Sequence, residues 1–278
     1  MPELPEVETV RKTLIPLVVG KTIVDVQAPY PKIIRNLSFS HFRGMLINET
    51  FLDIKRKGKF LIFVFNNHLL VSHLRMEGKY FYKTNQELEK HEHVIFWFSD
   101  GSSLHYHDTR KFGTMYLFPT NDFNLINHLE PLSKVGLEPM DEAMNPTYLA
   151  SKFIKSTKAI KTTLLDQTVM AGLGNIYVDE VLFLSHLHPT TSTNKITFED
   201  IKMIIENSQT VLQKAITLGG TTIRTFTSAH AVTGRFQNEL LVHTKSICPV
   251  CGTAIIKIKV GGRGTYVCEN CQKPLTSN

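Results

Sequence analysis

The stretch CPVCGTAIIKIKVGGRGTYVCENC, residues 248–271, contains all four cysteines of the chain. Its two Cys-x2-Cys pairs can surround one tetrahedral Zn²⁺ with four thiolates, and the ligands are Cys248, Cys251, Cys268 and Cys271. Two disulfides or four free thiols are the alternatives, and a cytosolic chain with no other cysteine disfavours disulfides. Four thiolates leave no open coordination position, so we expect one structural Zn²⁺ in a β-hairpin finger.

Upstream of this stretch, the pattern is helical. Apolar residues recur at helical spacing over 201–216, which predicts a helix of about five turns that ends at Gly219-Gly220. Residues 221–235 have no apolar period and indicate a long loop of the kind that often forms a functional lid. Pro131, Gly136, Pro139 and Pro146 punctuate a stretch typical of a linker.

The first half of the chain has a different pattern. After Pro5, apolar residues at helical spacing predict one amphipathic helix that bends or ends near Pro16. Short β-like runs follow, separated by turn residues; they are 22–27, 51–55, 60–65, 69–74, 94–98, 103–107 and 114–118. Many short strands with short gaps predict a β-sandwich or barrel. The chain is therefore expected to be an α+β protein, with a β-rich first half and a helical second half that carries the zinc hairpin.

Composition and charge limit the function classes. The 278 residues are 42% hydrophobic and 20% charged, which excludes wholesale disorder. The longest apolar run, residues 60–65, is far too short to span a bilayer, and the acidic start MPELPEVE does not resemble a secretory signal, so we expect a cytoplasmic protein. The net charge is +6; residues 1–150 are balanced, and 14 basic against 8 acidic residues follow them. Such a surplus suits nucleic acid or an acidic membrane surface, and a solvated basic face is the alternative.

The amino end is the first candidate for chemistry. Removal of Met1 before the small residue Pro2 would leave a secondary amine, which forms a cationic iminium when it condenses with an aldehyde carbon. This cation makes elimination from the neighbouring carbon easy, and Glu3 beside it is placed for acid–base work. The alternative is an ordinary helix start with proline and acidic residues in the first turn.

Two further groups of residues could contact a nucleic acid. Residues 171–177 combine two glycines with Asn175, which could cap a helix beginning at Ile176 and form a phosphate site, with Lys155, Lys158 and Lys161 upstream; an interhelical turn is the alternative. The turns RMEG (75–78) and DTRKFG (108–113) place Met76, Arg110 and Phe112 where they could wedge into a base stack. Core positions for Met76 and Phe112 are the alternative. The nearby histidines His91 and His93 favour phosphate or structural contacts over a metal site, because no other ligand cluster lies near them.

Taken together, these motifs resemble the bacterial formamidopyrimidine-DNA glycosylase (Fpg/MutM) family. The resemblance runs in register from residue 2 to about 273, through MPELPEVE (1–8), RKGKFL (56–61), HLRMEG (73–78), KHEH (90–93), RKFG (110–113), GLGNIY (172–177), GGTT (219–222) and the four cysteines. Residues 228–233 depart from the family's loop, so the groups that would read the base are not identified.

The resemblance implies a role for each candidate residue. Pro2 corresponds to the nucleophile that attacks C1′, and Glu3 to the acid that assists opening of the sugar ring. Lys59 corresponds to the group acting at β-elimination and Arg263 to the group acting at δ-elimination. Met76, Arg110 and Phe112 correspond to the wedge, and His91, Lys161 and Asn175 to phosphate contacts.

The resemblance also implies an organisation, a reaction and a partner. The expected parts are a catalytic β-sandwich domain (1–130), a linker (131–146), a helical DNA-binding domain with a helix–two-turns–helix module and a lesion-capping loop (147–235, the loop being 221–235), and the zinc finger (236–278). The implied enzyme is a monomeric, nucleoid-associated glycosylase and abasic-site lyase that acts on double-stranded DNA with oxidised purines or abasic sites, without membrane contact and with zinc as its only cofactor. The alternatives are an endonuclease VIII-like enzyme for oxidised pyrimidines, against which Leu4, Met76 and Phe112 argue, and a non-catalytic zinc-finger DNA-binding protein.

Overall fold

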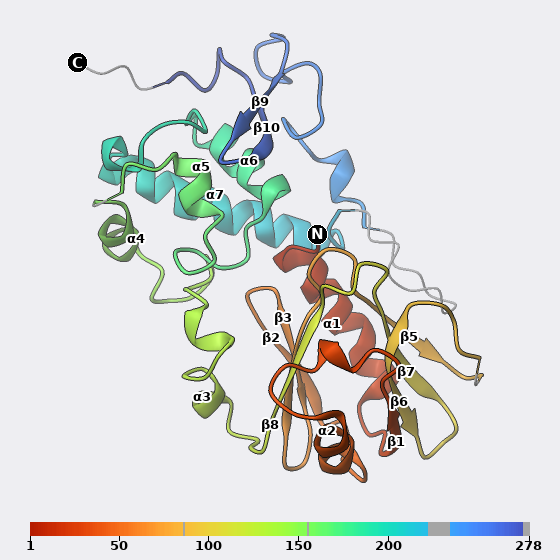
Figure 1. Ribbon diagram of the computed structural model, residues 1–278. Coiled ribbons are helices and arrows are strands. Elements are labelled where there is room, and N and C mark those ends of the chain that lie inside the picture. Colours follow the sequence, from red (N-terminus) through yellow and green to blue (C-terminus); the bar gives the residue numbers. More distant parts are fainter. Residues whose placement is uncertain (86, 155, 222–233, 275–278) are drawn as a thin grey trace. The chain divides into compact units, whose positions relative to one another are not determined.

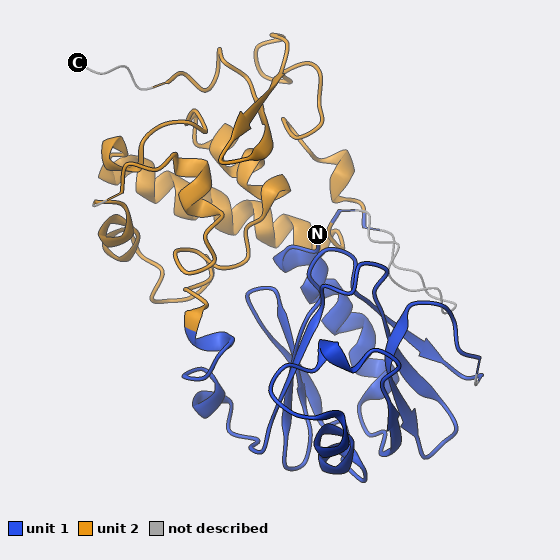
Figure 2. Ribbon diagram, viewed as in Figure 1, with its two compact units in different colours: residues 1–133, 221–234 blue, residues 134–220, 235–278 orange. Residues whose placement is uncertain are grey.

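The structure, a computed structural model, describes residues 1–85, 87–154, 156–221 and 234–274 (Figure 1). The chain divides into two compact units (Figure 2). Unit 1 comprises residues 1–133 and 221–234, and unit 2 comprises residues 134–220 and 235–278.

Unit 1 contains two antiparallel four-stranded sheets with strand orders β1-β6-β7-β5 and β2-β3-β4-β8. The strands are β1 (Ile23–Gln27), β2 (Asp53–Lys57), β3 (Phe60–Val64), β4 (Leu69–His73), β5 (Lys79–Lys83), β6 (Glu92–Phe98), β7 (Ser103–His107) and β8 (Thr114–Phe118). Alternate residues of both sheets fill one core, in which Phe63 contacts Tyr80 with ring centroids 5.3 Å apart. The expected α+β fold with a β-sandwich is confirmed.

The sequence pattern located most strands of unit 1 to within two residues. It missed β5, because the run KYFYK has a lysine at each end and follows Gly78 directly. It also missed the short helix α2 (Phe39–Leu46), which buries only Phe42 and Leu46 and therefore gives little apolar period. Two single-turn 3₁₀ segments (Pro31–Ile33 and Leu132–Lys134) and the short helix α3 (Phe123–Ile126) complete the regular structure up to residue 134.

Helix α1 (Leu4–Val18) opens the chain and packs against strands of both sheets (Figure 1). Val7, Val10, Leu14 and Val18 are fully buried, as their helical spacing predicts. Pro16 lies inside α1, which ends two residues later at Val18. The helix holds the amino end of the chain against the core of unit 1.

Unit 2 is helical and ends in a hairpin. Its helices are α4 (Pro146–Phe153), α5 (Ile160–Leu164), α6 (Asn175–Leu184) and α7 (Phe198–Thr217), and short 3₁₀ segments lie at Thr193–Lys195 and Phe236–Asn238. Helix α7 matches the predicted long helix and is followed by Gly219 and Gly220, both at positive φ. The antiparallel strands β9 (Ile256–Val260) and β10 (Arg263–Val267) form the predicted hairpin. None of the described helices is both long enough and apolar enough to cross a bilayer.

Candidate active site and zinc site

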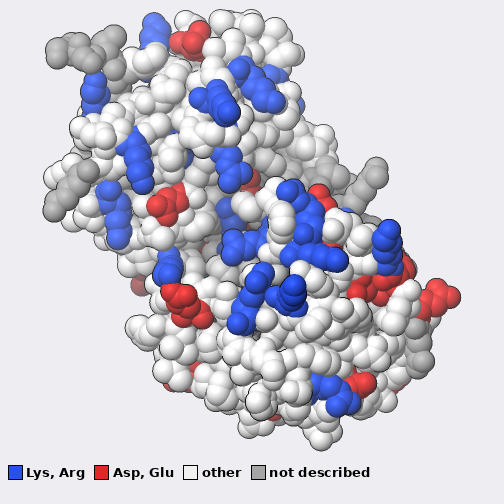
Figure 3. All heavy atoms as spheres, in the orientation of Figure 1, with Lys and Arg blue, Asp and Glu red and all other residues white. Residues whose placement is uncertain are grey.

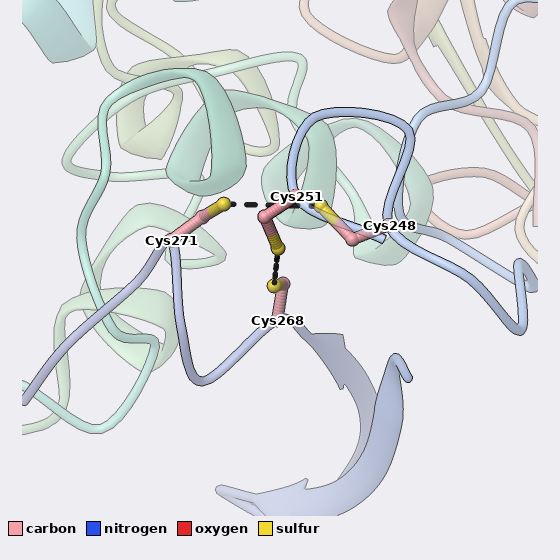
Figure 4. Close-up of side chains that lie close together, drawn as sticks. All are labelled: Cys248, Cys251, Cys268 and Cys271. Atoms are coloured by element: carbon pink, nitrogen blue, oxygen red, sulfur yellow. Dashed lines mark hydrogen bonds between the residues drawn. The ribbon is translucent and has the colours of Figure 1, made fainter. Parts of the chain in front are cut away.

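The four cysteines form a compact cluster in unit 2 (Figure 4). Their Sγ atoms lie within 4.8 Å of one another, with 3.8 Å between Cys248 and Cys271 and 3.5 Å between Cys251 and Cys268. A disulfide needs about 2.05 Å, whereas four sulfurs bound to one tetrahedral Zn²⁺ lie about 3.8 Å apart. The residues therefore fit one structural Zn²⁺, as the sequence predicts.

The amino end is held by reciprocal hydrogen bonds at the start of α1. Glu3 is the N-cap residue and forms a capping box with Glu6, whose Oε2 accepts the Glu3 backbone N–H at 2.8 Å. The other carboxylate oxygen of Glu6 accepts the backbone N–H of Thr221 at 2.9 Å and its hydroxyl at 3.0 Å. Glu3 and Glu6 are each only 2% exposed, whereas Pro2 is half-buried. Glu6 thus fixes the residues next to Pro2 and also anchors residue 221. The expected lesion-capping loop 221–235 otherwise lies largely outside the described residues.

A buried ion pair connects α1 to the turn that carries Lys59. Glu8 accepts from Arg11 at 2.7 Å and from Arg56 at 3.1 Å, and Arg56 also donates to the carbonyl of Gly58 at 2.9 Å. Burial opposes ionisation of Glu8, but hydrogen bonds and charge from Arg11 and Arg56 prevail and lower the pKa of its carboxyl. The β2–β3 turn, with Gly58 at φ +56°, is thereby held against the helix that positions Pro2.

Lys59 is the second residue of this turn, between Gly58 and the first residue of β3, and it lies next to a neutral histidine. Its side chain is nearly buried, and its positive charge acts on His73 of β4. Burial first, and then the charges of Arg75 and Lys59, lower the pKa of His73 to about 3. His73 Nδ1 accepts the backbone N–H of Arg75 at 2.9 Å, which fixes the start of the RMEG turn. At neutral pH this imidazole is therefore an uncharged acceptor beside two cations.

The two turns that are expected to form the wedge, RMEG and DTRKFG, both pack against the hydroxyl of Tyr106. A Cβ added to Gly78 would lie 2.3 Å from the Tyr106 hydroxyl oxygen, and one added to Gly113 would lie 1.7 Å from it. The buried Asp108 accepts the backbone N–H groups of Arg110 at 3.0 Å and Gly113 at 2.8 Å. Both turns therefore pack against the same hydroxyl, which sets their spacing.

The side chains that are expected to form the wedge reach the surface. Phe112 is 51% exposed, and the Arg110 guanidinium lies 4.8 Å from the centroid of its ring, so a core position for Phe112 is ruled out. Met76 is half-buried. Arg75 and Lys111 adopt positive φ angles of 55° and 58°, a strained conformation for residues with side chains. The turns thus hold a cation and two apolar side chains at the surface of unit 1.

His91 lines a pocket of about 280 Å³ in unit 1 together with Tyr30, His93 and Lys111. It has a positive φ of 72°, and its carbonyl accepts the Asp108 N–H at 3.0 Å, which joins it to the Arg110 turn. His93 is buried and bonds the Asp108 carbonyl at 2.9 Å. Of the two histidines, His91 is the one placed at the surface.

In unit 2 the structure corrects the expected phosphate contact of Lys161 and changes the expected capping role of Asn175. Lys161 is fully buried, and its ammonium donates to Asp179 at 2.7 Å and to Thr265 at 2.8 Å, which contradicts a direct phosphate contact. Helix α6 is capped by Gly174, so Asn175 is its first residue rather than its cap. Asn175 is half-buried, and its Nδ2 donates to the carbonyl of Gly264 at 3.0 Å. Lys161 and Asn175 thus meet on the strand that carries the exposed Arg263.

Basic side chains predominate on the face of unit 2 shown in Figure 3, and a second group of them gathers on unit 1. The arrangement within each unit suits a polyanion, whose affinity comes mainly from phosphate neutralisation.

Four buried residues of the site were not identified from the sequence. Glu6, His73, Asp108 and Asp179 position other groups rather than facing solvent. Glu6 and Asp179 each lie among buried neighbours on all sides of their helices, and a carboxylate within a run of apolar residues is the sequence signal for this role.

Comparison with known proteins gives three family matches along the chain. Residues 1–115 match the formamidopyrimidine-DNA glycosylase N-terminal domain, and residues 135–227 match the H2TH domain of the same enzyme family. Residues 247–274 match the zinc finger found in FPG and IleRS. The matches follow one another in the order of the elements described above.

Relatives of nearly the same length are similar throughout. The formamidopyrimidine-DNA glycosylase of Bacillus anthracis is 48% identical over 276 residues, which cover 98% of this chain and 99% of the relative. That of Exiguobacterium sibiricum is 49% identical over 277 residues, with the same coverage of each chain. The Lactococcus lactis Fpg (MutM) bound to DNA containing N7-benzyl-Fapy-dG has a TM-score of 0.89 at 45% identity, over 98% of this chain and 100% of that one. The same bacterial protein bound to abasic-site DNA has a TM-score of 0.90 at 44% identity with equal coverage.

Proposed function

Because the chain belongs to the formamidopyrimidine-DNA glycosylase family, we propose that it excises oxidised purines, such as 8-oxoguanine and formamidopyrimidines, and then cleaves the strand by β,δ-elimination. It is a DNA glycosylase of base-excision repair, and its partner is DNA. The observation that carries the proposal is full-length similarity to enzymes of this family, together with a half-buried Pro2 held beside a buried Glu3.

The first proposed step is attack on the sugar. A stacked base cannot be reached by an amine of the protein, so the damaged nucleotide is extruded, and Met76, Arg110 and Phe112 fill the gap that it leaves. The Pro2 nitrogen, freed by removal of Met1, forms a bond to C1′, and the base departs with the electron pair of the glycosidic bond and takes up the proton that the nitrogen loses. Glu3 donates a proton to O4′ as the C1′–O4′ bond breaks, which leaves a cationic iminium.

The proposed eliminations follow from this cation. Loss of the C2′ proton expels the 3′ phosphate, with Lys59 acting at the sugar or its flanking phosphate. A second elimination, in which the C4′ proton is lost, expels the 5′ phosphate, with Arg263 as the assisting group. Water then hydrolyses the iminium and regenerates Pro2. The structural Zn²⁺, held by four thiolates, stabilises the hairpin that presents Arg263 and takes no part in bond breaking.

We also propose the remaining features implied by the resemblance. The enzyme acts as a monomer in the cytoplasm, associated with the nucleoid, and its surplus of basic residues after position 150 supports binding to duplex DNA. The division at residues 130, 146 and 235 stays a prediction. His91 and Asn175 are proposed as phosphate contacts. Similarity over nearly the whole chain to enzymes of one family argues against a non-catalytic finger protein and against the endonuclease VIII-like alternative.

Borohydride trapping tests the nucleophile. The wild-type chain should form a covalent adduct with a duplex containing 8-oxoguanine, whereas Pro2→Gly should lose base excision and trapping but keep duplex binding. Pro119→Gly, at an exposed proline of unit 1, is the matched control and should trap normally. Mass spectrometry should show that active enzyme lacks Met1. Trapping by a chain that retains Met1, or undiminished trapping by Pro2→Gly, would disprove the assignment, and faster excision of oxidised pyrimidines than of 8-oxoguanine would favour the endonuclease VIII-like alternative.

A further inference from the structure

Helix α6 carries two adjacent carboxylates, Asp179 and Glu180, that are 1% and 2% exposed. A buried carboxylate is costly unless it is paired, so each of them must have partners. Glu180 accepts the backbone N–H groups of Leu241, Val242 and His243. Burial nevertheless prevails and raises the pKa of the Glu180 carboxyl. Glu180 therefore fixes the segment that leads towards the finger.

Asp179 gathers two side-chain donors and one backbone donor. Its Oδ1 accepts from the Lys161 ammonium at 2.7 Å, and its Oδ2 accepts from His243 Nδ1 at 2.7 Å. Oδ2 also accepts the backbone N–H of Tyr266 at 3.2 Å. Because an ionised carboxylate only accepts hydrogen bonds, it suits a position surrounded by donors. An asparagine there would direct an NH₂ group at one of them.

The same cluster holds strand β10 at Arg263 and at the three residues that follow it. Lys161 donates to the Thr265 hydroxyl at 2.8 Å and to the Gly264 carbonyl at 3.3 Å. The Thr265 hydroxyl in turn bonds the carbonyl of Arg263 at 3.1 Å. The turn before Arg263 lies against α5, because a Cβ added to Gly261 would be 2.5 Å from Thr162 Oγ1. The backbone around the exposed Arg263 is thus bonded to side chains from α5 and α6.

We propose that Asp179 is a positioning residue for Arg263, and that it acts through Lys161 and Thr265 and through its own bond to the Tyr266 amide. The inference rests on the proposed role of Arg263 at the second elimination. A buried cluster of this kind fixes one docked arrangement of the hairpin, because all its donors and acceptors are satisfied together only when β10 is in place. The Arg263 guanidinium stands at the end of a long side chain on the first residue of β10. Its backbone must be held in place, because a small displacement of an assisting group lowers the reaction rate by large factors.

The test is the ratio of δ- to β-elimination products, measured in single turnovers of the zinc-loaded full chain on a duplex with one abasic site. Asp179→Asn should lower this ratio about tenfold or more, while the yield of β product changes little. Asp166→Asn is the matched control, because the Asp166 carboxylate bonds the Thr168 amide and hydroxyl within one exposed turn of unit 2. It should leave the ratio unchanged. Zinc content and thermal unfolding of each variant establish that it is folded at the assay temperature.

A second variant tests the inference independently, in case Asp179→Asn does not fold. Thr265→Val keeps the side-chain shape and removes only the hydroxyl that joins Lys161 to the Arg263 carbonyl, so it should lower the same ratio. Arg263→Ala must lower the ratio as well, and adding Asp179→Asn to it should cause no further fall, because both changes then act through one group.

The possible failures are distinguishable. An unchanged ratio in Arg263→Ala shows that the proposed function misassigns Arg263, and it overturns the inference as well. A lowered ratio in Arg263→Ala with unchanged ratios in Asp179→Asn and Thr265→Val overturns the inference alone. Additive effects in the double variant also overturn it, since Asp179 would then act through another residue.

Discussion

His73 shows how burial, helped by two neighbouring cations, can hold an imidazole neutral. Burial and the charges of Arg75 and Lys59 lower its pKa to about 3, whereas the same side chain titrates near 6.5 in an unfolded chain. The unfolded state therefore takes up a proton as the pH falls below 6.5, and the native state does not do so until near pH 3. Stability that is present above pH 6.5 is consequently lost progressively on acidification.

His73→Asn should remove this pH dependence. Between pH 7.5 and 5.0 the wild-type free energy of unfolding should fall by about 2 kcal/mol more than that of the variant. Urea unfolding followed by the fluorescence of Trp97, the only tryptophan of the chain and a residue of unit 1, measures the difference. Other buried histidines contribute equally to both proteins and cancel. Equal losses in the two proteins would show that His73 is not the group responsible.

The glycines beside Tyr106 give a second prediction for single residues. Gly113→Ala would place a methyl group 1.7 Å from the Tyr106 hydroxyl, so the turn that carries Arg110 and Phe112 must move. We expect a loss of about 1–3 kcal/mol in stability, and a larger fall in excision of 8-oxoguanine than in cleavage of a preformed abasic site. Parallel single-turnover assays on the two duplexes measure this. Gly44→Ala in α2, where an added Cβ meets nothing within 4 Å, is the control. Equal losses on both duplexes would count against a wedge role for the turn.

At the scale of elements, the β9–β10 hairpin depends on close contact with α5. Gly261 and Gly262 both adopt positive φ, 54° and 79°, but only Gly261 lies against Thr162. Alanine at either position pays a similar backbone cost of about 1–2 kcal/mol, and only Gly261→Ala also pushes the hairpin away from the helix. Comparing Gly261→Ala with Gly262→Ala therefore separates the effect of backbone strain from the effect of a lost contact between the hairpin and α5.

Gly261→Ala should weaken duplex binding several-fold more than Gly262→Ala does. The reason is that the displaced hairpin carries Lys257, Lys259 and Arg263, which can neutralise phosphates. Titration with a fluorescently labelled duplex at fixed salt measures both affinities. Adding Thr162→Ala to Gly261→Ala should restore binding, because it removes the oxygen that the methyl group meets. Equal affinities for the two glycine variants would show that contact with α5 is dispensable.

At the scale of the whole molecule, the zinc cluster contributes to the core of unit 2. Cys248 and Cys268 pack with Phe183 of α6 and with Val242, so the metal fixes side chains that also contact the helices. Four thiolates without the ion would repel one another or take up protons, and the hairpin would lose its geometry.

Removing zinc with a chelator should therefore abolish duplex binding, and adding Zn²⁺ back under reducing conditions should restore it. Fluorescence anisotropy of a labelled duplex follows binding, and thiol titration confirms that four cysteines become reactive. The fluorescence of Trp97 in unit 1 should stay unchanged, because that unit has its own core. Full binding by a chain with four reactive thiols would show that the finger is not needed.

The sequence by itself determined the features that are encoded locally. The spacing of Cys248, Cys251, Cys268 and Cys271 defined a zinc site, period-two and period-3.6 patterns located most strands and helices, and motifs in register identified the family. Only the tertiary structure decided which polar residues face each other across the chain. A lysine looks the same in the sequence whether it lies on a surface or in a core, so the sequence could not show that Lys161 pairs with Asp179 and supports β10. The physical reason is that burial and hydrogen-bond partners come from residues distant in sequence, about which local patterns carry no information.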